Sequence, residues 1–257
     1  MPSWICNPTM RSKTTPPADS PVMHFAETLY RLFPEFIPTQ TLYIDLEGRQ
    51  SGSEDILSLY WPVVAGNRRF SWLKRRTTSG IQLKDFNSVL HRIGADKPRW
   101  VMVFSAGKEE PDEHLRLNQL FGRNIFPESC WVNLHHVVQR SRVLKQCIRE
   151  HRYVWHCNDQ KRVRYSLEAL EWEFGIIRPP HTRAHNNCYQ DQDGQPGLMQ
   201  VLSSAKRSIE GLASQTEEKY LQEYCKYDVR NMFSISAACE RALFTKDERK
   251  SRRRSMG

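Results

Sequence analysis

Residues 41–62 have the sequence TLYIDLEGRQSGSEDILSLYWP, and this stretch decides the predicted fold. Residues 41–46 and 56–61 are rich in β-branched, aromatic and other apolar side chains, which favour β-strands. The segment GRQSG at residues 48–52 lies between them and is typical of a turn. The sequence therefore predicts two consecutive strands joined by a short turn.

Further strands and helices are predicted on the C-terminal side of this pair. Residues 69–74 predict a third strand, and residues 83–93 have a helical period that ends at Gly94. The apolar run RWVMVFSAG, at residues 99–107, predicts a buried strand. A helix is predicted within residues 109–122, with Pro in its first turn and Gly beyond its end.

The remaining elements complete the predicted fold class. The run CWVNLHHVV at residues 130–138 predicts a strand that continues into a helix, and residues 23–36 predict a helix before the first strand. From about residue 140 the chain is expected to be mostly helical, with a last helix at roughly residues 217–244. This order predicts an α/β fold, with a mixed sheet of about five strands flanked by helices and a helical C-terminal part.

The composition sets the expected domains and surroundings. Residues 1–22 predict a disordered leader, residues 23–245 one folded domain, and residues 246–257 a disordered basic tail. No run of about 18 apolar residues occurs, so no membrane-spanning helix and no membrane partner are expected. The 7 cysteines have no paired spacing, which favours a reducing compartment and predicts a cytoplasmic protein. A net charge of +9 favours a polyanionic partner.

The first candidate site is the motif Asp45-Leu46-Glu47-Gly48 in the opening strand. Side chains alternate along a strand, so Asp45 and Glu47 are expected on the same face. Two neighbouring carboxylates repel each other and are costly to desolvate, and a divalent cation removes both costs. An ordinary solvated strand end remains the alternative, because Asp-x-Glu is a weak pattern.

The second candidate site is Tyr224-Cys225-Lys226-Tyr227-Asp228 within the last predicted helix. Tyr224 and Asp228 are four residues apart and therefore neighbours on one helix face. A phenol beside a metal-bound carboxylate can hold an attacking water. The alternative is a helix that presents a Tyr–Asp hydrogen bond to solvent.

Together and in this order, the two motifs resemble the DEDD superfamily of 3′–5′ exonucleases, in the subclass with Tyr in the last motif. The likeness spans about residues 41–245 and includes the segment SLEALEWEFGI at residues 166–176. The overall pattern is closest to the group of predicted exonucleases with a ribonuclease-H-like fold. The resemblance implies that Asp45, Glu47, Tyr224 and Asp228 are catalytic, and that all of these except Tyr224 are metal ligands.

The resemblance also implies a middle acid at a strand-to-helix turn, for which the sequence offers SAGKEEPDEHL at residues 105–115. Asp112 is assigned as this catalytic and metal-binding acid, although it stands one position later than the family pattern. Glu113 is the alternative, because Leu117, Leu120 and Phe121 follow it at helical spacing. The implied cofactors are two Mg²⁺ or Mn²⁺ ions about 4 Å apart, which would hydrolyse a phosphodiester bond.

The predicted partner is nucleic acid, at single-stranded or frayed 3′ ends. Residues 67–76, NRRFSWLKRR, hold five basic residues interleaved with aromatic ones, a composition suited to phosphate contacts and base stacking. The candidate binding residues are Arg68, Arg69, Trp72, Lys74 and Arg183. A solvated basic surface is the alternative.

Two other functions compete with the exonuclease hypothesis. One is a catalytically inactive ribonuclease-H-like module that binds nucleic acid or partners, and the other is an endonuclease on the same fold. A zinc site at His181, His185 and Cys188 is disfavoured, because a fourth ligand with suitable spacing is missing. The sequence leaves DNA versus RNA and the protein partners open.

Overall fold

A computed structural model describes Pro17 and residues 19–49, 53–62, 69–74, 81–105, 112–150, 154–157, 160–163, 165–179 and 198–255. Most of the predicted leader, at residues 1–16 and 18, lies outside this part of the chain. So do Arg68, Arg183 and the candidate zinc ligands at residues 181–188. For Arg69 and Asp112 the structure describes the backbone but not the side chain.

A five-stranded mixed sheet forms the centre of the fold, which confirms the predicted fold class. Its strands have the spatial order β3-β2-β1-β4-β5. β2 is antiparallel to both β1 and β3, whereas β4 is parallel to both β1 and β5. In chain order the strands are β1 (Thr41–Arg49), β2 (Ser53–Trp61), β3 (Arg69–Lys74), β4 (Trp100–Val103) and β5 (Trp131–Asn133). β1 is therefore the central strand, and the sheet order is compatible with a ribonuclease-H-like arrangement.

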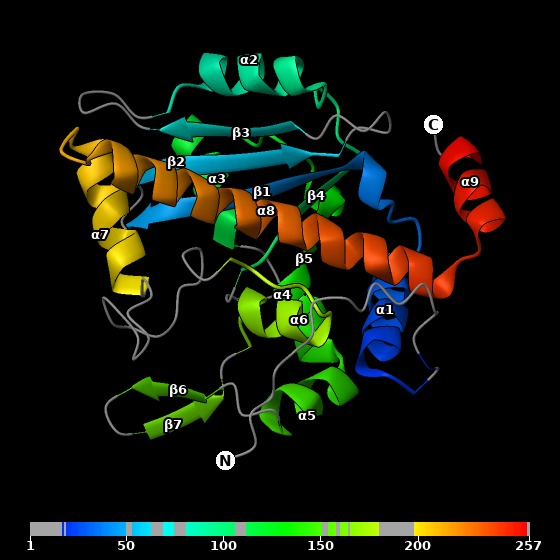
Figure 1. The fold of residues 1–257 in the computed structure, drawn as a ribbon. Coiled ribbons are helices and arrows are strands. Elements are labelled where there is room, and N and C mark those ends of the chain that lie inside the picture. Colours follow the sequence, from blue (N-terminus) through cyan, green and yellow to red (C-terminus); the bar gives the residue numbers. More distant parts are fainter. Residues whose placement is uncertain are drawn as a thin grey trace.

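Helices cover both faces of this sheet (Figure 1). The long α8 crosses one face and packs on β1, β2 and α1, whereas α2 lies on the other side, near β3. The described helices are α1 (Pro21–Leu32), α2 (Leu83–Ile93), α3 (Asp112–Phe121), α4 (Leu134–Arg140), α5 (Arg142–Glu150), α6 (Leu167–Glu173), α7 (Leu198–Ile209), α8 (Gln215–Leu243) and α9 (Lys246–Ser255), together with two short 3-10 turns at Pro38–Gln40 and Glu128–Cys130. The sheet therefore has a buried layer on each side.

Local signals in the sequence account for the bounds of two of these helices. α2 ends where Gly94 adopts a left-handed conformation with φ of 76°, which glycine allows without steric cost. α8 begins at a capping box, in which the Ser214 side chain accepts from the Glu217 N–H and the Glu217 side chain accepts from the Ser214 N–H. The predicted ends at residue 94 and near residue 217 are thus confirmed.

The alternation of side chains along β1 separates the two buried layers. Leu42, Ile44 and Leu46 pack with the apolar face of α2. Tyr43 points to the opposite layer, where its ring contacts Phe233 of α8 at a centroid distance of 5.7 Å. Asp45 and Glu47 share the parity of Tyr43, and they therefore face the layer that α8 covers.

The predicted helical C-terminal part is confirmed, but two segments within it differ from the expectation. Part of the stretch after residue 140 is a β-hairpin, β6 (Val154–Cys157) with β7 (Gln160–Val163), and not helix. The basic tail is not disordered, because most of it forms α9. The side chain of Arg252 in α9 lies over the ring of Phe244, 4.3 Å from its centroid, and donates a hydrogen bond to the Pro34 carbonyl. These contacts attach the charged helix to the domain.

The first helix begins close to the predicted start of the folded domain. α1 begins at Pro21, two residues before the predicted start of the domain, and Ser20 caps it by accepting from the Met23 N–H. Among the described residues, none of the helices is long and apolar enough to cross a membrane.

Candidate metal centre

The central strand presents the first two candidate acids. Asp45 is opposite Ser58 of β2, and Glu47 is opposite Ile56. The strand pairing shifts register between Glu47 and Gly48, so the ladder is irregular directly after the second acid. Both carboxylates are half-buried, on a strand whose other face is fixed by packed aliphatic side chains.

Helix α8 brings the third acid to the same place. One oxygen each from Asp45, Glu47 and Asp228 can be chosen so that all three lie within 4.8 Å of one another. Residues 45 and 228 are distant in the chain, so only the packing of α8 on β1 and β2 creates this cluster. Carboxylate oxygens converging in this way form a donor set that suits Mg²⁺ or Mn²⁺.

The electrostatics of Asp45 show an incompletely compensated charge. Burial raises the pKa of Asp45 well above its usual value, and the nearby charges of Glu47 and Asp228 raise the pKa further. Arg116 acts in the opposite direction but does not cancel these effects. The Asp45 Oδ2 atom is buried and has no hydrogen-bond partner among the described residues. A bound divalent cation would supply this missing partner.

A buried arginine compensates the third acid. Arg178 donates a hydrogen bond to Asp228 Oδ1 and holds Glu171 in a bidentate pair, with both N–O distances 2.6 Å. The side chains of Arg178 and Glu171 are each only 2% exposed. Burial also raises the pKa of Asp228, and this rise is opposed by Arg178. Burial raises the pKa of Glu171 to about 7, although the charge and the hydrogen bonds of Arg178 act in the opposite direction.

Tyr224 lies one helical turn before Asp228, as its spacing predicted. The phenol is buried, and its hydrogen bond to Asp228 lowers the pKa of that carboxyl. Burial, followed by the charges of Asp228 and Glu47, raises the pKa of Tyr224 well above its usual value. The Arg178 guanidinium lies 5.7 Å from the centroid of the ring. The phenol is therefore a fixed, protonated hydrogen-bonding group beside two acids.

The neighbouring thiol is not a nucleophile in this environment. Cys225 is fully buried behind the acids, and burial raises the pKa of its thiol well above the usual value. The negative charges of Glu47 and Asp45 raise it further. A protonated buried thiol is unreactive, which agrees with the absence of a histidine partner in the motif.

Of the two candidates for the middle acid, Glu113 is the one whose side chain the structure describes. Glu113, in the first turn of α3, is 7% exposed, and its charge raises the pKa of Asp45. The side chain of Asp112 lies outside the described part of the structure. Arg116 of the same helix reaches β1, where it donates to the Leu46 carbonyl at 3.4 Å. The α3 helix is thus anchored beside the cluster through the residues that follow Glu113.

The predicted nucleic-acid-binding residues have mixed surroundings. Lys74 forms an ion pair with Glu218 of α8 at 2.7 Å and is half-buried. Trp72 packs beside a buried cluster that contains Ile56 and Tyr224. These contacts give Lys74 and Trp72 structural roles near the acids.

The main residues that the motifs did not single out are Glu171 and Arg178. Glu171 lies inside SLEALEWEFGI, the segment quoted for the resemblance, on α6, but its role in holding an arginine could not be inferred from that pattern. Arg178 follows α6 in a loop, 50 residues before its partner Asp228. No spacing rule connects a loop arginine to a distant helix.

Searches of protein-family models, of curated proteins and of solved structures found no match for this chain. The residues of the cluster and the resemblance of the two motifs therefore carry the functional proposal.

Proposed function

We propose that this protein is a divalent-cation-dependent nuclease that hydrolyses phosphodiester bonds from the 3′ end of a nucleic-acid strand. The observation that carries the proposal is the convergence of Asp45, Glu47 and Asp228, with oxygens within 4.8 Å of one another. The raised pKa of Asp45 and its unpartnered Oδ2 atom support a cation at this place. The 3′–5′ polarity and the second cation rest on the sequence resemblance.

Each residue of the cluster would have a distinct role in this reaction. Asp45, Glu47 and Asp228 would hold Mg²⁺ or Mn²⁺, with Glu113 as a further acid close to Asp45. When bound, the cation would supply an activated water and stabilise charge on the departing oxygen. Tyr224 would orient the water by hydrogen bonding. Arg178 would hold the Asp228 carboxylate in a fixed rotamer through the contact that it already makes.

Digestion of 5′-labelled single-stranded DNA and RNA in Mn²⁺ tests the proposal. The wild-type chain should shorten the labelled strand stepwise. The Asp45→Asn and Asp228→Asn variants should digest it only at the background rate. Asp85→Asn is the matched control, because Asp85 is an exposed acid on α2, which packs on the opposite face of the sheet. A wild-type protein without activity, or full activity in both cluster variants, would refute the proposal. Cleavage of circular single-stranded DNA would indicate an endonuclease instead.

One observation favours a second function, that of a catalytically inactive module that binds nucleic acid. Arg178 already supplies a positive charge to Asp228, and this contact can replace a cation on that side of the cluster. In that case labelled single-stranded DNA would bind equally well in EDTA and in Mn²⁺ and would remain intact. Equal binding without cleavage would therefore replace the nuclease proposal with this one.

A further inference from the structure

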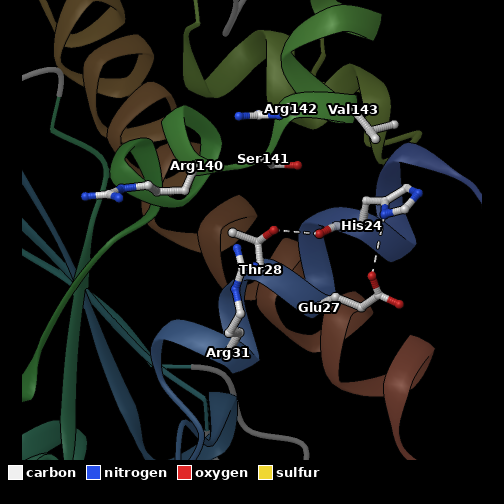
Figure 2. Close-up of a pocket in the computed structure, with 8 residues that line it drawn as sticks. All are labelled: His24, Glu27, Thr28, Arg31, Arg140, Ser141, Arg142 and Val143. Carbon is white, nitrogen blue, oxygen red and sulfur yellow. Dashed lines mark hydrogen bonds and ion pairs between the residues drawn. The ribbon is translucent and has the colours of Figure 1, made fainter.

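A cleft of about 660 Å³ lies apart from the acidic cluster, between α1 and the junction of α4 with α5. Figure 2 shows the labelled residues of α1 on one side of this space and residues 140–143 on the other. The acids of the metal centre contribute nothing to its lining. Its lining residues are His24, Glu27, Thr28, Arg31, Arg140, Ser141, Arg142 and Val143.

The lining is strongly cationic. The lining contains three arginines and a single acid, Glu27, and His24 pairs with this acid at an Nδ1–Oε2 distance of 3.5 Å. Among the residues that the structure describes, neither Arg31 nor Arg142 forms an ion pair with an acid. Guanidinium groups bind phosphate through charge and paired hydrogen bonds. The cleft therefore favours an anion with several acceptor oxygens.

A buried hydroxyl in the same cleft has no partner. Ser141 is 2% exposed, and its Oγ atom makes no hydrogen bond to any described group. Its backbone is fixed, because its N–H donates to the carbonyls of Val137 and Val138 at 3.0 and 3.1 Å. By contrast, the Thr28 hydroxyl in the same lining donates to the His24 carbonyl at 2.8 Å. The Ser141 hydroxyl is thus the buried donor that a ligand can still use.

The start of α5 adds backbone donors at this point. α5 begins at Arg142, directly after Ser141, and runs for 9 residues. The first N–H groups of a helix have no acceptor within it, and its N-terminal end carries a partial positive charge. Arginines, a buried hydroxyl and the first turn of α5 therefore line the same cleft, a combination suited to phosphate.

We propose that this cleft is a second anion site, which binds a phosphate group of a nucleotide or of a nucleic-acid strand. Ser141 Oγ and the first N–H groups of α5 donate to the phosphate oxygens, while Arg31 and Arg142 neutralise the charge. The volume exceeds that of one phosphate and lies in the range of small-molecule sites, so the group attached to the phosphate also fits. The proposal uses no residue of the metal centre and does not depend on nuclease activity.

An NMR titration of the full chain tests this site directly. Backbone amide signals of Arg142, Val143 and Leu144 are followed while inorganic phosphate, and separately a short 5′-phosphorylated DNA strand, is added. We expect saturable shifts at these amides, and an affinity at least about fivefold lower in the Arg31→Gln/Arg142→Gln double variant. Arg123→Gln is the matched control, because Arg123 is exposed and lies outside the cleft.

The outcomes separate the sources of the phosphate. Shifts with the strand and with inorganic phosphate support a strand-binding site, and shifts with inorganic phosphate alone support a site for small phosphates. Ser141→Ala, which leaves both arginines in place, should also weaken binding. Unchanged amide signals, or equal affinity in the double variant and in Arg123→Gln, would overturn the proposal. The same titration with Asp45→Asn should give the wild-type result, whatever that variant does to nuclease activity.

Discussion

Asp45 and Asp228 belong to one cluster, yet the protein compensates their charges differently. On the α8 side, Asp228 receives Arg178 and the hydrogen bond of Tyr224. On the β1 side, the Asp45 Oδ2 atom is buried without a partner among the described residues, and like charges surround it. Fixed protein charges thus compensate one half of the cluster, whereas the charge of the other half stays poorly compensated within the described residues. This difference implies opposite effects for changes on the two sides.

The largest effect is expected from breaking the compensated side. Arg178→Gln leaves Glu171 and Asp228 buried without their shared cation, so the free energy of unfolding should fall by about 3–5 kcal/mol. Urea denaturation measures this loss, and Arg123→Gln, which removes the same charge from an exposed position, should stay within about 0.5 kcal/mol of wild type. A similarly small change in Arg178→Gln would mean that the buried pair does not stabilise the fold.

Removing the hydroxyl of Tyr224 tests what its hydrogen bond to Asp228 contributes to catalysis. Tyr224→Phe keeps the ring against Arg178 and removes the hydroxyl that contacts Asp228. Hydrolysis should slow by about 10- to 100-fold, which corresponds to about 1.4–2.7 kcal/mol. Single-turnover digestion gives the rate, and the Mn²⁺ affinity should remain close to wild type. A lost Mn²⁺ affinity would show that the phenol positions a metal ligand and not the water.

A change on the uncompensated side should stabilise the protein. Asp45→Asn replaces a poorly compensated, half-buried carboxylate with a neutral amide, and in EDTA the free energy of unfolding should rise by about 1 kcal/mol. Asp85→Asn, on the other face of the sheet, should not have this effect. Urea denaturation of both variants in EDTA decides the sign. Destabilisation by Asp45→Asn would mean that its charge is compensated after all.

The pH dependence tests the same groups without a substitution, and its sign follows from the raised pKa values. Asp45, Asp228 and Glu171 bind protons more tightly in the folded state, so the metal-free protein should lose stability as pH rises through their folded pKa values. For Glu171 the window runs from 4.5 to about 7. Thermal unfolding in EDTA over this range measures the slope. Saturating Mn²⁺ should reduce the slope, and a stability that rises with pH would contradict the assigned shifts.

The sheet could be predicted because its signals are local. The alternation in residues 41–62 predicted β1 and β2 and placed Asp45 and Glu47 on one face, and the spacing of Tyr224 and Asp228 placed them on one turn of α8. The hairpin β6–β7 was missed because its strands, Val154–Cys157 and Gln160–Val163, are only four residues long and too short for a clear period.

Long-range contacts explain what the sequence could not provide. The pairing of Arg178 with Asp228 depends on how a loop meets a helix 50 residues later, and no local pattern encodes it. The order of α9 has a similar origin. Its run of charges predicts a solvated tail, but Arg252 finds the Phe244 ring and the Pro34 carbonyl. The missed ion pair and the wrongly predicted tail both involve arginines. Their partners are distant in the chain or are not acids.

The most direct test of the shared cation is calorimetric titration of Mn²⁺ into the wild-type chain and into Asp45→Asn and Asp228→Asn. Acids that converge from β1 and α8 on one cation should make binding saturable in the wild type and greatly weaken it in each variant, while Asp85→Asn binds normally. The result also gives the number of cations bound. Wild-type affinity in either cluster variant, or no binding to the wild-type chain, would contradict a shared cation.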